Sequence, residues 1–335
     1  MRLRELSMFA WLCLGALPAL AASQAGKPPP SDPFATADGV MHWMDGYHTA
    51  PEPKRVPDAV RAMSRLGLIR DLESAGMFVG FLAGVIAENQ AEAEAMIGKM
   101  FPLPPEDQGV VLKAIAYSGV PDWKDMLGRV AERTPARKAL LGKVLDAKFQ
   151  PLFATPLETG PVILDTLWGY HLAGGSFEPV QRIISALRWS KERKNSGFEL
   201  PWKVEKIDLN KLTVGATAKW TLTAAGQRDK DLLDLYRLEL KHQPPDIAQP
   251  LKEVVVAAEN FEVARIRKEA LEAIENLKRQ NPAQGNPWGW WAQAGTTMLS
   301  LGCVVAGATG HAEIAAPCII TGAAASGATK LFGGQ

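Results

Sequence analysis

The sequence predicts an all-α protein, and three observations lead to that fold class. Apolar residues recur at intervals of three and four along most of 57–280, which is the spacing of one helix face. Proline stands where such helices begin, as at Pro104 and at Pro135, which follows the capping residue Thr134. The stretch richest in Thr and Val, 212–222, lacks the strict alternation of a strand. We therefore expect an irregular right-handed stack of helix hairpins, similar to an α-solenoid, or a helical bundle, with a Gly/Ala-rich helical hairpin at the C-terminus.

Residues 1–22 have the pattern of a secretory signal peptide. Arg2 and Arg4 are followed by an apolar run over 8–20 and by a small-residue cleavage zone over 19–22. The apolar run is too short to span a bilayer by itself. We therefore expect the protein to be exported to the periplasm or the outside of the cell.

Residues 23–56 are predicted to form a Pro-rich leader, which carries the first candidate site. His42, Asp45 and His48 are spaced so that they partly share one helix face, and imidazole and carboxylate are both ligands of zinc. These three residues are therefore candidate metal ligands, or the centre of an enzyme site. The alternative is that both histidines are the polar edges of aromatic packing in this segment.

The region 57–280 is the predicted helical-repeat domain. Four of its segments share one outline, in which an apolar helix, a short break and a second amphipathic helix follow one another. The breaks fall at helix-ending residues, namely Asn89, Gly119, Gly174 and Gly226. This outline loosely resembles degenerate helical-repeat proteins of the tetratricopeptide or HEAT kind, such as exported bacterial proteins of unknown function. The resemblance implies stacked helix pairs with a long surface suited to peptides or partner domains.

Two further predictions concern the packing of this domain. Residues 250–280 are expected to form one long helix, which Asn281 and Pro282 terminate. The apolar stripes place the following residues on the buried face: Phe78, Phe81, Val85, Leu112, Ile115, Leu167, Ile183, Ile184, Leu187, Leu232 and Leu235.

The last region, 281–335, is a tail rich in Trp, Gly and Ala. Two short apolar segments flank 310–313, and the small residues at Gly302 and Ala306 allow close helix packing. If 310–313 is the turn of a hairpin, Cys303 and Cys318 lie at similar heights, and an oxidising compartment favours their disulfide. The alternatives are disorder and membrane insertion, although each segment is shorter than the about 20 residues that a span needs.

Charge and motifs narrow the predicted function. A net charge of +1 does not favour nucleic-acid binding, and the common nucleophile, phosphate-binding and dinucleotide motifs are absent from the sequence, so no cofactor is expected. Trp168, Tyr170 and His171 mark a candidate groove between helix pairs, or His171 is a satisfied core residue.

We therefore expect an exported, non-enzymatic scaffold that binds a protein or peptide partner in the cell envelope. Two alternatives remain open. The first is a membrane-associated envelope protein anchored by the tail, and the second is an enzyme with its site near His42, Asp45 and His48.

Overall fold

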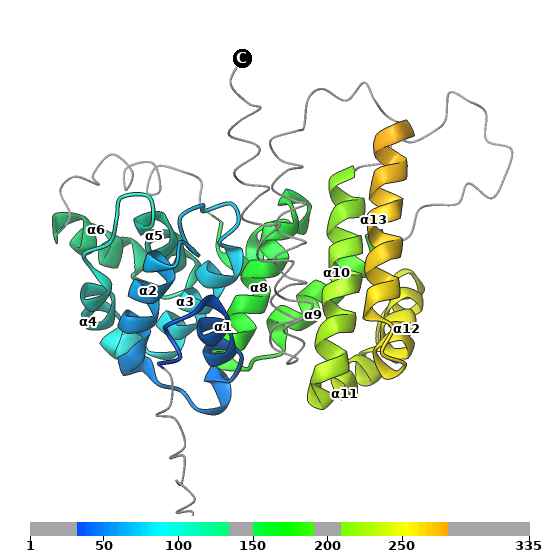
Figure 1. Ribbon diagram of the computed structural model, residues 1–335, viewed down its shortest axis with the longest axis horizontal. Helices are drawn as coiled ribbons and strands as arrows, with labels where there is room; N and C mark the ends of the chain where they lie inside the picture. The colour runs from blue at the N-terminus through cyan, green and yellow to red at the C-terminus, as the bar shows by residue number, and fades with distance from the viewer. Residues whose placement is uncertain (1–31, 134–149, 191–208, 281–335) are drawn as a thin grey trace, which may run out of the picture. The chain divides into compact units, whose positions relative to one another are not determined.

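The computed structural model describes residues 32–133, 150–190 and 209–280, and all regular secondary structure in these ranges is helical (Figure 1). The all-α prediction is therefore confirmed. None of these helices is both long and apolar enough to cross a membrane. The predicted signal peptide, the tail and its two cysteines, Cys303 and Cys318, lie outside the described residues.

The described elements follow one another along the chain as α-helices and short 3-10 helices. They are α1 (Ala37–Asp45), η1 (Tyr47–Thr49), η2 (Pro53–Arg55), α2 (Val56–Arg65), α3 (Gly76–Glu88), α4 (Gln90–Met100), α5 (Gln108–Tyr117), α6 (Trp123–Arg133), η4 (Leu152–Ala154), η5 (Leu157–Thr159), α8 (Pro161–Gly174), α9 (Glu178–Ser185), η6 (Ala186–Trp189), α10 (Leu209–Arg228), α11 (Lys230–Glu239), α12 (Pro245–Glu259) and α13 (Val263–Gln280).

The helical body begins before the predicted boundary at residue 57. Helix α1 starts at the cap Thr36, whose hydroxyl oxygen accepts the Gly39 N–H at 3.1 Å. Phe34, Met44 and Tyr47 are buried in the main core, where their apolar surface is removed from water. The part of the predicted leader from Phe34 onward is therefore an integral part of the fold.

Three of the four predicted helix breaks are confirmed. Helix α3 ends before Asn89, α5 is followed by Gly119 at φ 74°, and α8 ends at Gly174 with the next glycine in a left-handed conformation. The fourth break is displaced by three residues, because α10 continues through Gly226 to Arg228 and Asp229 separates it from α11. A Cβ at Gly226 would stand 2.7 Å from the ring of Tyr236, so this glycine allows α10 and α11 to approach closely.

The predicted single helix over 250–280 is wrong. Helix α12 begins earlier, at Pro245, and a turn at Asn260 and Phe261, with Phe261 at φ 57°, separates it from α13. Both helices pack against α10, and Figure 1 shows α13 alongside it. The turn lets the buried residues Ala257 and Ile266, which lie on either side of it, contribute to one small core cluster.

Helix α3 makes its most extensive contact with α8, which lies far along the chain, and has only a small contact with its immediate successor α4. In a solenoid each repeat contacts only its neighbours, so this pairing is typical of a helical bundle. Glycines bring the two backbones together. A Cβ at Gly80 would stand 2.6 Å from the carbonyl carbon of Thr166, and one at Gly169 would stand 2.7 Å from the backbone nitrogen of Phe81.

The predicted buried face is largely confirmed. Phe78 and Leu235 are only partly buried and pack against the core. The other members of the predicted set are buried in the main core, namely Phe81, Val85, Leu112, Ile115, Leu167, Ile183, Ile184, Leu187 and Leu232.

Candidate functional site

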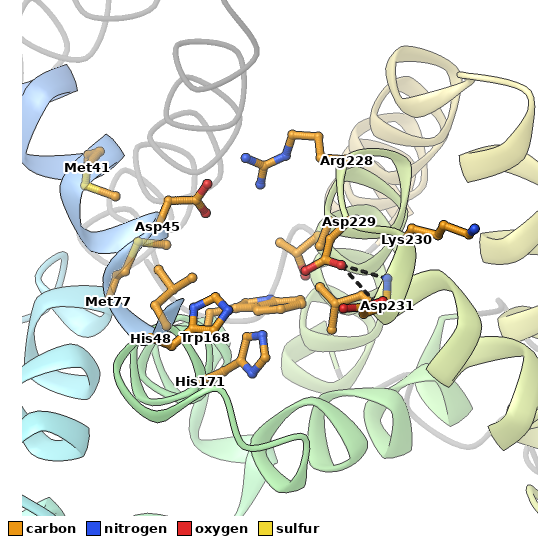
Figure 2. Close-up of a pocket in the computed structure, with 14 residues that line it drawn as sticks. Met41, Asp45, His48, Met77, Trp168, His171, Arg228, Asp229, Lys230 and Asp231 are labelled. Atoms are coloured by element: carbon orange, nitrogen blue, oxygen red, sulfur yellow. Dashed lines mark hydrogen bonds between the residues drawn. The ribbon is translucent and has the colours of Figure 1, made fainter. Parts of the chain in front are cut away.

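A cavity of about 360 Å³ lies between α1, η1, α3, α8, α10 and the first turn of α11 (Figure 2). Its volume falls within the range of sites that hold small organic molecules. The described residues that line it are Met41, Asp45, His48, Met77, Trp168, His171, Leu172, Thr221, Ala225, Arg228, Asp229, Lys230, Asp231 and Leu232.

Helix α8 supplies the buried floor of the cavity. Trp168 and His171 are three residues apart and therefore lie on the same face of α8. They are only 6% and 4% exposed, respectively. The close glycine contacts with α3 hold this helix in place, and α3 adds Met77 to the lining. The floor is therefore built on rigid elements rather than on loops.

The corner between α10 and α11 supplies the opposite wall. Asp229 is the N-cap of α11, where its Oδ1 accepts the backbone N–H of Asp231 at 2.8 Å and that of Leu232 at 3.2 Å. This capping arrangement turns the chain sharply after Arg228 and holds the Asp229 carboxylate beside the cavity.

His171 is the central polar group of the floor. Its Nδ1 lies 2.8 Å from the carbonyl oxygen of Ser176, and because a carbonyl only accepts, Nδ1 carries the proton. Within the described part of the chain, Nε2 of this ring has no hydrogen-bond partner. Burial lowers the pKa of His171, and His48 lowers it further, while the Ser176 hydrogen bond and the carboxylates of Asp229 and Asp45 act in the opposite direction. At neutral pH the imidazole is therefore uncharged and Nε2 is an acceptor.

Aromatic rings surround this acceptor. The ring centroid of His171 lies 6.0 Å from that of His48 and 5.8 Å from that of Trp168, which meets it edge-on at 70°. The ring of Phe177 stacks on the imidazole of His171, with a distance of 6.0 Å between the ring centroids. Two polar atoms of this floor are buried without a partner among the described residues, namely Nε1 of Trp168 and Nδ1 of His48. The floor is thus aromatic, with unused hydrogen-bonding capacity.

Charged side chains surround the mouth. Asp45 from α1 and Arg228 from α10 direct their charged ends toward each other in Figure 2, yet they form no ion pair. Within the ranges that the structure describes, Arg228 donates a long hydrogen bond from Nε to the carbonyl oxygen of Ala224 at 3.4 Å. The Lys230 side chain is directed away from Asp45 (Figure 2). The chemistry that the described lining offers is therefore hydrogen bonding and charge over an apolar floor.

The structure separates the predicted metal ligands. Asp45 and His48 line the cavity, whereas His42 is exposed and is not part of the lining. The described ranges contain no group of three or more His, Cys, Asp or Glu side chains placed to hold a metal ion. The spacing of the three residues suggested a shared helix face, but α1 ends at Asp45 and His48 belongs to the following 3-10 turn.

The predicted groove residues are also divided. Trp168 and His171 line the cavity, whereas Tyr170 packs edge-on against Phe153 with a centroid distance of 5.2 Å. His171 is buried, as expected if it were a satisfied core residue. However, only its Nδ1 forms a hydrogen bond within the described residues.

Sequence reasoning missed the α10–α11 corner. Asp229 precedes a periodic apolar run, which is the usual signature of an N-cap, and that signal would have placed the helix break three residues after Gly226. No local signal indicates that Arg228 and Asp229 face α1 and α8. Searches against protein-family models, curated proteins and solved structures find no match to this chain.

Proposed function

We propose that this chain is an exported helical binding protein whose cavity between α1, α8 and the α10–α11 corner takes up the ligand. The ligand would be a small organic molecule, either free or as the exposed end of a peptide partner. The observation that carries this proposal is the imidazole of His171, a side chain only 4% exposed that lines a cavity of ligand size and whose Nε2 forms no hydrogen bond with any described residue.

The lining supports binding of a molecule with an apolar body. Met41, Met77, Leu172 and Leu232 supply aliphatic surface, and methionine adapts its shape to different ligands. A few polar groups at fixed positions then orient the ligand, as is usual in small-molecule sites. Here His171 is held by Ser176, so its acceptor has a fixed position.

The side chain of His171 is buried, yet it borders the cavity and its Nε2 has no partner among the described residues. Hydrogen bonding a buried polar group contributes about 1 kcal/mol, and leaving one unpaired costs about 1–3 kcal/mol. Water bonds such a group almost as well as a protein group does, and a ligand with a matching donor takes the place of that water. Binding would therefore use the hydrogen-bonding capacity that the fold leaves open at His171.

A fragment screen against the full chain tests the proposal, with the indole N–H resonance of Trp168 as the reporter. Ala225→Phe fills the cavity from α10, and Ala91→Phe is the matched control on an exposed position of α4. We expect fragments that shift the Trp168 signal in the wild type and in Ala91→Phe but not in Ala225→Phe.

Leu172→Trp, on half-buried α8 surface, fills the same cavity if Ala225→Phe does not fold. Far-UV circular dichroism verifies that each variant keeps its helical content. If no fragment in the screen shifts the Trp168 signal, or if binding survives in a folded cavity-filled variant, the cavity is not a binding site.

A further inference from the structure

We propose that the ligand of this cavity carries an organic ammonium group, as a primary or secondary amine on an apolar or aromatic body. The inference rests on the proposed binding function and specifies the chemical class of the ligand. It is carried by the placement of carboxylates, aromatic rings and a free acceptor around one small space.

The carboxylates are the first line of support. Asp45 approaches from α1 and Asp229 from the α10–α11 corner, so acidic groups border the cavity from two sides (Figure 2). Both act electrostatically on the buried ring of His171, in the direction that favours positive charge there. Burial of the ring and the neighbouring His48 act in the opposite direction. A ligand cation at the floor would be attracted by the same two carboxylates.

The free hydrogen-bonding positions fit an ammonium group, which has donors and no acceptor. Nε2 of His171 accepts, because Nδ1 holds the ring proton. Oδ1 of Asp229 is occupied by two backbone N–H groups, which leaves Oδ2 for another donor. The Asp45 carboxylate forms no hydrogen bond or ion pair with any described residue. The open positions beside the cavity therefore include acceptors on His171, Asp229 and Asp45, together with one buried donor, the indole N–H of Trp168.

Aromatic surface completes the arrangement. Trp168 lies beside His171 and His48 at the floor, and indole is the ring that attracts cations most strongly. Such an attraction contributes about 0.5–2 kcal/mol, with the larger values in desolvated sites. Met41 and Met77 cover the apolar remainder of the ligand.

Arg228 is the main charge that opposes this assignment. Its guanidinium is exposed at the mouth, opposite the exposed carboxylate of Asp45, whereas the His171 ring is buried at the floor. A carboxylate ligand bound to Arg228 would also face Asp45 and Asp229, which would repel it. The two assignments make opposite predictions for Arg228→Gln: amine affinity rises by about twofold to fivefold when a like charge is removed, whereas carboxylate affinity falls.

Isothermal titration calorimetry on the full chain tests the inference with three probes of similar size, namely phenethylamine, phenethyl alcohol and phenylpropionate. We expect the amine to bind at least about tenfold more tightly than the alcohol, and the carboxylate more weakly than either. Asp45→Asn and Asp229→Asn should each weaken amine binding by about threefold to tenfold and leave the alcohol unchanged. Asn also caps helices well, so Asp229→Asn preserves the start of α11.

Asp246→Asn is the matched control, because it makes the same charge change at an exposed first-turn position of α12 outside the cavity. If the alcohol or the carboxylate binds as tightly as the amine, or if none of the three binds while other fragments shift the Trp168 signal, the ammonium assignment is overturned and the binding function stands. If no fragment of any class shifts that signal, the binding function itself is overturned.

Discussion

Replacing Gly80 with Ala tests the contact on which the site is built. The added Cβ would stand 2.6 Å from the carbonyl carbon of Thr166 on α8 and closer still to its oxygen. Nonbonded carbons are optimally about 3.5–4.0 Å apart, so the overlap is about 1 Å or more. Both partners are backbone atoms, and no side-chain rotation relieves the overlap. Helices α3 and α8 must therefore move apart.

The magnitude follows from two opposing effects. Overpacking of a core contact costs about 1–3 kcal/mol, and a backbone clash belongs at the upper end or beyond. Ala is a better helix former than Gly by about 1 kcal/mol, which offsets part of that cost. We expect Gly80→Ala to lower the free energy of unfolding by about 2 kcal/mol, and Tm by about 4–8 °C for a chain of this size.

Urea denaturation of the full chain, monitored by circular dichroism at about 222 nm, measures the change in the free energy of unfolding. The same substitution at a second glycine, Gly128, is the matched control. Gly128 lies inside α6, and a Cβ at that position would meet nothing within 4 Å. Gly128→Ala should therefore raise the free energy of unfolding by about 0.4–1 kcal/mol. If Gly80→Ala is as stable as the wild type, or is stabilised like Gly128→Ala, the α3–α8 contact is not where the structure places it.

Three further outcomes are expected. Phe81→Ala should cost about 3–5 kcal/mol in urea denaturation, because the side chain is fully buried, whereas Leu238→Ala, at a side chain 54% exposed, should change stability by less than about 0.5 kcal/mol; a Phe81 effect below about 1 kcal/mol would mean that it does not belong to the core. Burial raises the pKa of Asp165 well above its usual value, so the stability of the wild type is lost as pH rises through the folded-state pKa. Asp165→Asn should therefore be more stable than the wild type at about pH 7 but not at about pH 4. An equal difference in stability between the two proteins at both pH values would contradict this. Burial lowers the pKa of His171 below the unfolded value of about 6.5, so the unfolded state takes up a proton first and stability falls below that pH. Between about pH 7.5 and about pH 5.5, chemical denaturation should show a smaller loss of unfolding free energy for His171→Gln than for the wild type. Identical losses would show that His171 does not contribute to the pH dependence of stability.

Helix identity and several boundaries could be predicted because they depend on residues close together in the chain. Apolar spacing predicted the helices on both sides of Asn89 and Gly119, and these breaks are where the structure has them. Hydrogen bonds within a helix join residues four apart, so the local sequence contains most of that information. The error at Gly226 has the opposite cause, since that glycine is explained by its contact with Tyr236 on the next helix.

The same limit applies to the long helix predicted over 250–280. Its apolar stripe continues on both sides of Phe261, and periodicity therefore favours one continuous helix. The chain turns there because α12 and α13 both pack on α10, which only the packing of distant helices decides.

The candidate site divides in the same way. The residue types of Asp45, His48, Trp168 and His171 marked two separate segments as candidates, because imidazole, carboxylate and indole carry recognisable chemistry wherever they occur. Their meeting in one cavity, the addition of the α10–α11 corner and the exclusion of His42 depend on helices far apart in the chain. The lowered pKa and the single bonded nitrogen of His171 likewise arise from burial, which exists only once those helices have packed.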